Sequence, residues 1–373
     1  MSLLETVSQK QKSGWVAMRL HVDVPLMAGI LVLFALGMMI LFSASGQSIG
    51  RLEAQGMRFV LGLVILLVLA QISPEHLRRW SPWLFAIGVC LLLAVEIIGD
   101  IGKGAQRWLD LGIIRFQPSE MMKLVVPMTI AWFLCDKPLP PAWRNLLISS
   151  AMILVPALLI AKQPDLGTAL LIASSGIFVL LLSGLSARLI IGLTALASAL
   201  APLLWYTLRD YQRQRVLTFL NPENDPLGAG YHIIQSKIAI GSGGVFGKGW
   251  FNGTQSQLDF LPERSTDFIL AVFAEEFGFI GVLILLAVYL FIIMRGLLIA
   301  VQAQDSFSRL LAGSLTLTFF IYVFVNIGMV SGLLPVVGVP LPLVSYGGTS
   351  LVTLMAGFGI LMSVHSHRKL LKR

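Results

Sequence analysis

Ten apolar stretches of membrane-crossing length recur along the 373 residues of this chain. A transmembrane helix needs about 20 predominantly apolar residues, because the hydrocarbon core of a bilayer is about 30 Å thick. Charged residues make up only 12% of the chain, about half the share found in soluble domains. The sequence therefore predicts an all-α polytopic membrane protein, a single integral domain over residues 1–373. Its spans are expected near 24–44, 57–72, 82–99, 119–135, 145–162, 166–184, 187–207, 267–294, 309–331 and 343–364.

The distribution of basic residues predicts the orientation of these spans. An even number of spans places both ends of the chain on one side of the membrane. Assigning alternate loops puts fourteen Lys and Arg residues on that side, against five in the short loops of the other side. Because Lys and Arg are enriched in short cytoplasmic loops, we expect both termini in the cytoplasm. The first apolar stretch is expected to stay as an uncleaved signal anchor.

Residues 208–266, between the seventh and eighth stretches, form one long polar loop on the outer side. A connection of this length should carry structure of its own, and residues 229–240 have the pattern of an amphipathic interfacial helix. The orientation rule does not explain basic residues in long loops. We interpret those of this loop as a site for an anionic group such as a lipid-linked phosphate: Arg209, Arg213, Arg215, Lys237, Lys248 and Arg264.

The glycine-rich run 241–249 in this loop is not a nucleotide-binding loop. A Walker-type loop would need Gly at Ser242 and Ser or Thr at Gly249, and Phe246 occupies the third glycine of the dinucleotide pattern. A flexible loop, or one whose backbone approaches a phosphate, remains open. The two cysteines, Cys90 and Cys135, lack metal-ligand spacing and are expected to be small apolar residues.

Ionisable residues near the outer boundary are the candidates for function. Glu120 and Lys123 are one helical turn apart, either as a local ion pair or as a functional pair, since charges are costly within a membrane. Asp165 lies in a tight turn rich in Pro and Gly, where it either caps the next helix or takes part in function. Asn326, a lone polar residue within a span, is expected to hydrogen-bond between helices.

Asp267 stands where the long loop re-enters the membrane. A helix beginning there would place Ala271 and Gly278 on the same face, and these small residues would leave room for a ligand. Glu275 and Glu276 would follow two turns deeper, where charges are expensive. A carboxylate at a helix start is also favoured by the helix dipole, so a structural role for Asp267 remains open.

Five motifs in order along the chain resemble the SEDS family of polytopic cell-wall proteins, whose members include RodA and FtsW. The match extends from the first span to the last, and residues 231–244 are most similar to the RodA branch. The motifs are KGAQRWLD at 103–110, FQPSE at 116–120, QPDLG at 163–167, LPE with TDF within 261–268, and PLPLVSYGG at 340–348.

The resemblance implies a peptidoglycan glycosyltransferase that polymerises lipid II, the undecaprenyl-diphosphate disaccharide-pentapeptide, during cell elongation. It implies a bacterial cytoplasmic (inner) membrane location with the active site facing the periplasm. It also implies a class B penicillin-binding protein as partner, within an elongation complex of MreC, MreD, RodZ and MreB. In the family, the acidic residue matching Asp267 is required for polymerisation, and the residues matching Glu120 and Lys123 line a cavity connected to it.

These implications assign roles to residues. Asp267 would act as the base that deprotonates the acceptor hydroxyl. The leaving diphosphate would be stabilised by basic side chains, and the predicted substrate-binding set is Glu120, Lys123, Arg115, Asp165, Arg213, Arg215 and Lys248. No cofactor or metal-ligand cluster is evident in the sequence, which leaves assistance by a divalent metal open.

Two other functions remain open. A lipid II flippase would be compatible with charges near the membrane, but a transporter should carry its ionisable site near the bilayer midplane, whereas these charges crowd the outer boundary. A scaffold without activity, holding a penicillin-binding protein, has no need of an outer carboxylate beside a basic loop.

Overall fold

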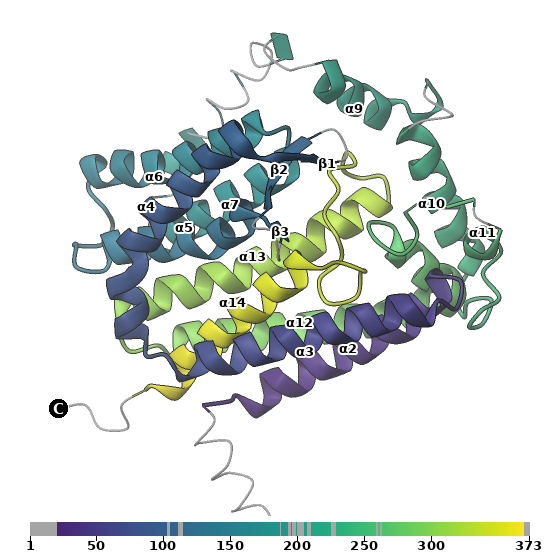
Figure 1. The fold of residues 1–373 in the computed structure, drawn as a ribbon, viewed down its shortest axis with the longest axis horizontal. Coiled ribbons are helices and arrows are strands. Elements are labelled where there is room, and N and C mark those ends of the chain that lie inside the picture. The colour runs from purple at the N-terminus through teal and green to yellow at the C-terminus, as the bar shows by residue number, and fades with distance from the viewer. Residues whose placement is uncertain are drawn as a thin grey trace, which may run out of the picture.

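The computed structural model describes residues 21–102, 105–110, 115–186, 188–192, 195, 199, 205–206, 210–224, 229–258, 260–261 and 263–368. Nine long helices of this part run roughly alongside one another (Figure 1). Seven are long and apolar enough to cross a membrane. The nine are α2 (Val24–Ala44), α3 (Ile49–Gln71), α4 (Pro74–Ile98), α5 (Pro118–Leu134), α6 (Trp143–Lys162), α7 (Leu166–Leu182), α12 (Ile269–Val301), α13 (Ser306–Val330) and α14 (Thr349–Ser366).

These helices match nine of the ten predicted spans. The seventh predicted span, 187–207, lies largely outside the described residues, as do the basic ends 1–20 and 369–373. Several helices begin with the side chains that favour a helix start. The carboxylates of Asp23, Asp165 and Asp305 accept the amide hydrogens of the first turns of α2, α7 and α13.

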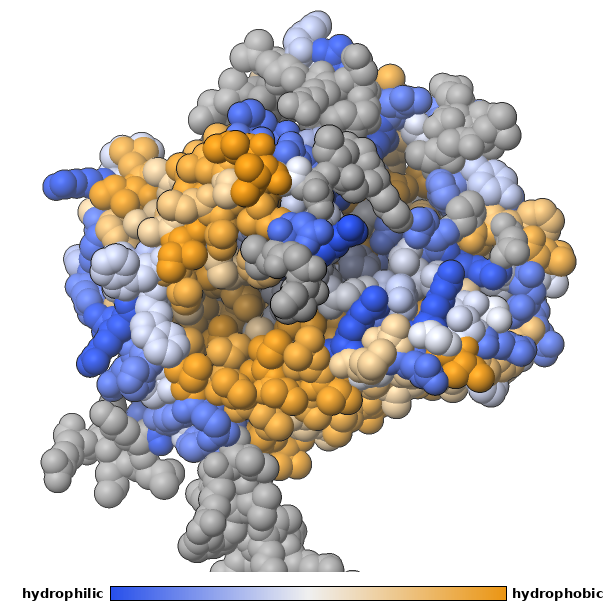
Figure 2. All heavy atoms as spheres, in the orientation of Figure 1, coloured by the Kyte–Doolittle hydropathy of each residue, from blue (hydrophilic) through white to orange (hydrophobic). Residues whose placement is uncertain are grey.

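One hydrophobic cluster extends from Leu26 in α2 to Val364 in α14. Helices α5 and α13 are largely buried, whereas α3 and α4 bury only a small part of their surfaces. The peripheral helices therefore turn apolar side chains outward. Figure 2 shows the result as an apolar band with polar side chains gathered on either side of it, which is the surface that a bilayer covers. The protein is a polytopic membrane protein.

The start of α2 and the end of α14 lie together, at the lower left of Figure 1. The ring of His21, just before α2, stacks on that of His367, with centroids 4.7 Å apart. The two ends of the described chain therefore emerge on the same face, as an even number of spans requires.

A buried carboxylate ties three helices together on this face. Arg295 of α12 donates from Nε and Nη2 to the two oxygens of Asp23, at 3.0 and 2.6 Å, and His365 of α14 lies 3.2 Å from the same carboxylate. Burial raises the pKa of Asp23. The hydrogen bonds from Arg295 and the Leu26 amide, together with the charges of His365 and Arg295, outweigh burial and hold this pKa below its usual value.

On the opposite face, the loop between α4 and α5 folds into a small antiparallel sheet. Its strands are β1 (Asp100–Gly102), β2 (Ala105–Asp110) and β3 (Arg115–Phe116), in the order β1-β2-β3. Leu109 pairs with Phe116, and Asp110 pairs with Arg115. The prediction of an all-α fold did not include this small sheet.

The long loop carries structure of its own, as predicted, in α9 (Asp210–Leu220), η1 (Pro222–Asn224), α10 (Ala229–Gly243) and α11 (Thr254–Gln257). The helix predicted over 229–240 is confirmed as α10, which packs along α12 and also contacts α13. Its buried side includes Ile233, Ser236 and Ala239, and Ser236 Oγ donates to the carbonyl oxygen of Val330 at 2.6 Å.

The glycine run is used to pack one backbone against another. Helix α12 is broken at Gly278, where φ is 63° and ψ is −165°. The amides of Lys248 and Gly249 donate to the carbonyl oxygens of residues 275 and 276, and the amides of residues 279 and 280 donate back to those of residues 244 and 245. A methyl group on Gly247 would lie 2.2 Å from the Glu276 carbonyl oxygen. The suggestion of a backbone open to a phosphate is therefore wrong, because these amides are already bonded to α12.

Candidate functional site

Asp267 lies in a turn just before α12, two residues ahead of Ile269, where the helix begins. The helix therefore begins near Asp267, as predicted, although Asp267 itself lies outside it. The expectation of room for a ligand beside Ala271 and Gly278 is wrong. Ala271 is fully buried, and a methyl group on Gly278 would stand 2.3 Å from the amide nitrogen of Gly247.

The connection between α13 and α14 holds this turn in place. Asn326 of α13, which is fully buried, donates from Nδ2 to the carbonyl oxygen of Asp267 at 2.9 Å and to that of Val339 at 2.8 Å. Ser345 Oγ donates to the carbonyl oxygen of Thr266, and the Tyr346 amide donates to that of Ser265. Asn326 was expected to hydrogen-bond between helices, but its partners are two backbone carbonyls outside helices, and its effect is to fix the backbone at Asp267.

The carboxylate of Asp267 is half-buried and faces the same connection. A methyl group on Gly338, whose φ is 74°, would lie 3.5 Å from Asp267 Oδ2. Glycine keeps this approach open and tolerates the left-handed backbone. The backbone of Asp267 is thus held by buried polar groups while its carboxylate stays partly accessible.

Glu120 and Lys123 form a buried ion pair in the first turns of α5. Lys123 Nζ donates to Glu120 Oε1 at 2.7 Å, and both side chains are about nine-tenths buried or more. The second carboxylate oxygen of Glu120 has no hydrogen-bond partner among the described residues. Buried polar atoms are usually satisfied, so this pair differs from a surface ion pair that merely supports a helix start.

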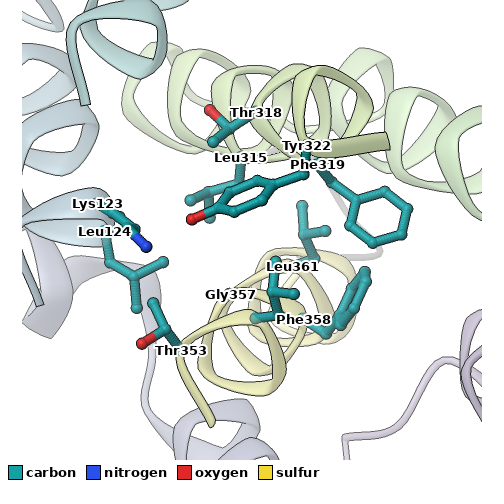
Figure 3. Close-up of a pocket in the computed structure, with 11 residues that line it drawn as sticks. Lys123, Leu124, Leu315, Thr318, Phe319, Tyr322, Thr353, Gly357, Phe358 and Leu361 are labelled. Carbon is teal, nitrogen blue, oxygen red and sulfur yellow. The ribbon is translucent and has the colours of Figure 1, made fainter. Parts of the chain in front are cut away.

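Lys123 also lines a cavity of about 30 Å³ between α5, α13 and α14. Its ammonium lies 5.4 Å from the centre of the Tyr322 ring. In Figure 3 the ammonium of Lys123 and the hydroxyl of Tyr322 point toward each other, and the rings of Phe319 and Phe358 lie beyond the tyrosine. The polar end of the cavity is therefore made by a lysine and a tyrosine, and the rest is largely apolar.

The segment 336–339 links this cavity to Asp267. Val339 packs with Tyr322 and Leu171 in one small cluster, while the adjacent Gly338 faces the Asp267 carboxylate. On the side of α7, a methyl group on Gly167 would lie 2.6 Å from the Val337 carbonyl oxygen. This one segment thus lies beside Asp267, beside Tyr322 near Lys123, and beside Gly167 near Asp165.

Asp165 caps the next helix, the first of the two roles that the sequence left open, and its part in function stays a prediction. Its Oδ1 accepts from the Thr168 amide at 3.2 Å and caps α7. Its Oδ2 lies 3.5 Å from Nε of Arg107, which also donates to the carbonyl oxygen of Pro164 at 2.8 Å. Arg107 comes from β2 and was not among the predicted site residues, although it lies within the KGAQRWLD motif.

The FTSW_RODA_SPOVE family model, described as "Cell cycle protein", matches residues 18–370. The chain belongs to the FtsW/RodA/SpoVE family. It is similar to the peptidoglycan glycosyltransferase MrdB of Escherichia coli (strain K12), with 57% identity over 369 residues that cover 99% of each chain. It is also similar to the probable peptidoglycan glycosyltransferase FtsW of Geobacter metallireducens, with 38% identity over 324 residues that cover 85% of each.

Solved structures of the FtsW/RodA/SpoVE type share this fold. A chain of a peptidoglycan synthase complex that coordinates polymerization and crosslinking is 35% identical, with a TM-score of 0.82 over 93% of this chain and 98% of that one. The rod shape determining protein RodA of Thermus thermophilus is 29% identical, with a TM-score of 0.70 over 93% and 98%. The resemblance inferred from the five motifs is confirmed at the level of the family.

Four predicted basic residues have other contacts in this FtsW/RodA/SpoVE protein. Lys248 Nζ is 2.8 Å from Oε1 of the fully buried Glu275. Arg213 donates to the carbonyl oxygens of residues 205 and 206. Arg115 is 73% exposed and lies 3.8 Å from Asp110 Oδ2, and Arg215 is exposed on α9. Their roles as substrate contacts stay predictions.

A different set of polar residues, on α3, contacts the loop that holds the Asp267 turn. Gln55, which is buried, donates from Nε2 to the carbonyl oxygen of Ser345 at 3.1 Å, and Arg51 donates to Ser265 Oγ at 3.3 Å. Arg51 and Arg58 are two of the five basic residues counted for the short outer loops, and neither was a predicted site residue. Arg51, Gln55 and Arg58 are spaced by four and then three residues, which places them on one face of a helix. This spacing could have identified them as one polar cluster from the sequence.

Chemically, the site offers a partly accessible carboxylate, a buried lysine–glutamate pair and several arginines. A carboxylate can accept a proton from a hydroxyl group, and lysine and arginine can stabilise a phosphate. Within the described ranges, no group of three His, Cys, Asp or Glu side chains could hold a metal ion.

Proposed function

We propose that this protein is a peptidoglycan glycosyltransferase that polymerises lipid II into glycan strands. The observation that carries this proposal is the 57% identity, over 99% of both chains, to a protein of that enzymatic name. The motifs that build the site around Asp267 support it. The enzyme would lie in the bacterial cytoplasmic membrane with both termini in the cytoplasm and Asp267 on the periplasmic side, as the bias of basic residues favours.

Asp267 acts as the general base in this proposal. The hydroxyl oxygen of the acceptor attacks the anomeric carbon of the donor sugar while the proton of that hydroxyl passes to the Asp267 carboxylate. The bond from the anomeric carbon to the diphosphate oxygen breaks, and its electron pair leaves with the diphosphate. The turn held by Asn326 and Ser345 keeps the carboxylate in position, so that little reorganisation is needed for the proton transfer.

The leaving diphosphate requires positive charge close to this carboxylate. Lys123 is the predicted cation whose neighbours are linked to Asp267, through Tyr322 and Val339, and it is the first candidate. Arg107 extends the same region toward Asp165. Arg115, Arg213, Arg215 and Lys248 remain further candidates on sequence grounds. Glu120 holds the ammonium of Lys123 in place.

The test is polymer formation by purified protein supplied with lipid II in detergent, where the two sides of a membrane do not exist. Asp267→Asn should lower the rate by at least about a hundredfold, the contribution expected of a general base. Glu223→Gln, which neutralises an exposed carboxylate in η1, serves as the matched control and should keep normal activity. Normal glycan synthesis by folded Asp267→Asn protein would refute the assignment.

A lipid II flippase is a second candidate because one observation favours it. Transporters often have interrupted spans near their sites, and α12 is interrupted at Gly278. The interruption is closed by the glycine run, however, and Glu275 accepts hydrogen bonds from Lys248 and from the amides of Gln255 and Ser256. Polymer in detergent distinguishes the enzyme from a flippase, which makes none.

The partner proposed for this enzyme is a class B penicillin-binding protein, which would cross-link the strands. Support comes from the 35% identical chain of a solved complex that coordinates polymerization and crosslinking. MreC, MreD, RodZ and MreB follow from the family resemblance alone. Co-purification of the full-length chain with the candidate partner tests the first contact, and the absence of a stable complex would count against it.

A further inference from the structure

Helices α3 and α14 lie side by side (Figure 1), and Arg58 of α3 lies against the loop that leads into α14. Its guanidinium carbon lies 4.6 Å from the centre of the Tyr346 ring. Gln55 and Arg51 occupy the same face of α3, one and two turns closer to its N-terminus, and contact Ser345 and Ser265. Arg51 is exposed and Arg58 is half-buried. Two positive charges, one exposed and one half-buried, therefore lie on the same face of α3.

The charge of Arg58 is not neutralised by the described chain. Its Nη1 nitrogen is buried and has no hydrogen-bond partner among the described residues, and their ion pairs do not include this arginine. Arg58 lies at the outer end of the predicted span 57–72, near the boundary of the membrane. A buried guanidinium nitrogen without a hydrogen-bond partner is unfavourable there, and an anion beside it would satisfy it.

The N-terminus of α14 lies at the same place. No side chain of the described chain caps it at Gly348, and a methyl group on Gly348 would lie 3.5 Å from Nε of Arg58. The free amides of a helix start carry partial positive charge. A guanidinium and a helix N-terminus repel each other unless an anion lies between them. Beside both, a methyl group on Gly347 would meet nothing within 4 Å, so the space is open.

We propose that Arg58 and the first turn of α14, with Arg51 at the rim, bind the phosphate of a membrane lipid. The ligand that fits best is the diphosphate of an undecaprenyl-linked substrate, an assignment that rests on the proposed function. The loop that contacts Arg58 is the one that holds the turn of Asp267, through the Tyr346 amide and the Ser265 carbonyl. A diphosphate on Arg58 would therefore lie on the α3 side of that turn. The guanidinium offers the two-pronged donor that phosphate oxygens prefer.

Binding, rather than turnover, tests this proposal, so that a failure of the enzymatic assignment does not obscure it. Full-length protein in detergent is titrated with undecaprenyl diphosphate and, separately, with phosphatidylglycerol, and bound lipid is measured by native mass spectrometry. Arg58→Gln should weaken the binding of undecaprenyl diphosphate by about tenfold or more, as expected for loss of a charged hydrogen-bond donor. Arg51→Gln should have a smaller effect because exposed charges contribute less.

The matched control is Arg79→Gln, the same change at an exposed arginine of α4, which should bind as the wild type does. Equal binding of undecaprenyl diphosphate by wild type and Arg58→Gln overturns the site. A loss confined to phosphatidylglycerol overturns the assignment to substrate and makes the site one for a lipid headgroup. If Arg58→Gln does not purify folded, Arg58→Lys takes its place. Lysine keeps the positive charge near Tyr346 but loses the paired N–H donors of the guanidinium. Undiminished diphosphate binding by Arg58→Lys therefore also overturns the proposal.

Discussion

Asn326→Ala tests whether a buried amide positions the general base. The side-chain nitrogen of Asn326 donates to two backbone carbonyl oxygens, those of Asp267 and Val339, and the residue is fully buried. Truncation leaves both acceptors without this donor. A buried polar group left unsatisfied costs about 1–3 kcal/mol. Only the hydrogen bond to Val339 is buried, since the one to Asp267 is part-buried, so we expect a loss of about 1–3 kcal/mol. Water that enters the vacated space would move the result toward the lower value.

The variant should also lose activity beyond its loss of stability. The turn at Asp267 is held on one side by Asn326 and on the other by Ser345, so removing one support lets the carboxylate shift. A displacement of about 1 Å at a reacting group costs about a hundredfold in rate. We therefore expect turnover of lipid II per folded molecule to fall by about ten- to a hundredfold, with a lower unfolding midpoint.

The assay measures polymer formation and thermal unfolding on the same detergent-purified sample. Asn145→Ala is the matched control, because Asn145 is only part-buried in α6 and accepts a single long hydrogen bond, 3.3 Å, from Lys137. It should change the unfolding midpoint little and turnover not at all. An Asn326→Ala protein that unfolds earlier but turns over normally would refute the positioning role. One with an unchanged midpoint would refute the energetic argument.

Two further predictions concern regions remote from the reaction. Gly247→Ala should lower the unfolding midpoint markedly, because φ is 81° there and the added methyl would lie 2.2 Å from the Glu276 carbonyl oxygen. The control is Gly241→Ala, where a methyl group meets nothing within 4 Å. It should leave the unfolding midpoint nearly unchanged. Asp23 has a pKa below its usual value in the folded protein, so its stabilising contribution is present above the unfolded pKa of 3.8 and is lost as pH falls through the folded one. The unfolding midpoint of wild type should thus fall more steeply below about pH 4 than that of Asp23→Asn, and parallel curves would contradict the role of the Asp23–Arg295 pair.

The spans were predictable because lipid imposes a constraint on each segment separately. Within a bilayer, backbone polar groups must be satisfied inside the segment, which makes an apolar run of sufficient length a helix whatever its neighbours are. The boundaries were less predictable. Helix α3 begins at Ile49 rather than at 57, and α14 begins at Thr349 rather than at 343. Polar residues can extend a helix beyond the lipid, and the segment before α14 is instead held by Gln55.

The site was partly predictable for a related reason. Asp267, Glu120 and Lys123 stood out because a charged residue beside an apolar run is costly and needs an explanation. The partners of the charges did not follow from the sequence. Lys248 lay in a basic loop and was assigned to a substrate, but its ammonium contacts Glu275, 27 positions away. Which charges face one another depends on how the helices pack.

Helix α12 shows both what the sequence predicts and what the packing of distant segments decides. Residues 267–294 form one apolar stretch and were expected as one helix, and a helix is found there. Its break at Gly278 and the turn that holds Asp267 ahead of it are set by segments far away in the chain, the glycine run and Asn326. The sequence by itself thus determined which segments cross the membrane and which carboxylates lie at its edge, because hydropathy and desolvation act on each residue locally. Only the tertiary structure decided which groups hold Asp267 and which arginines approach it, because those contacts join segments brought together by packing.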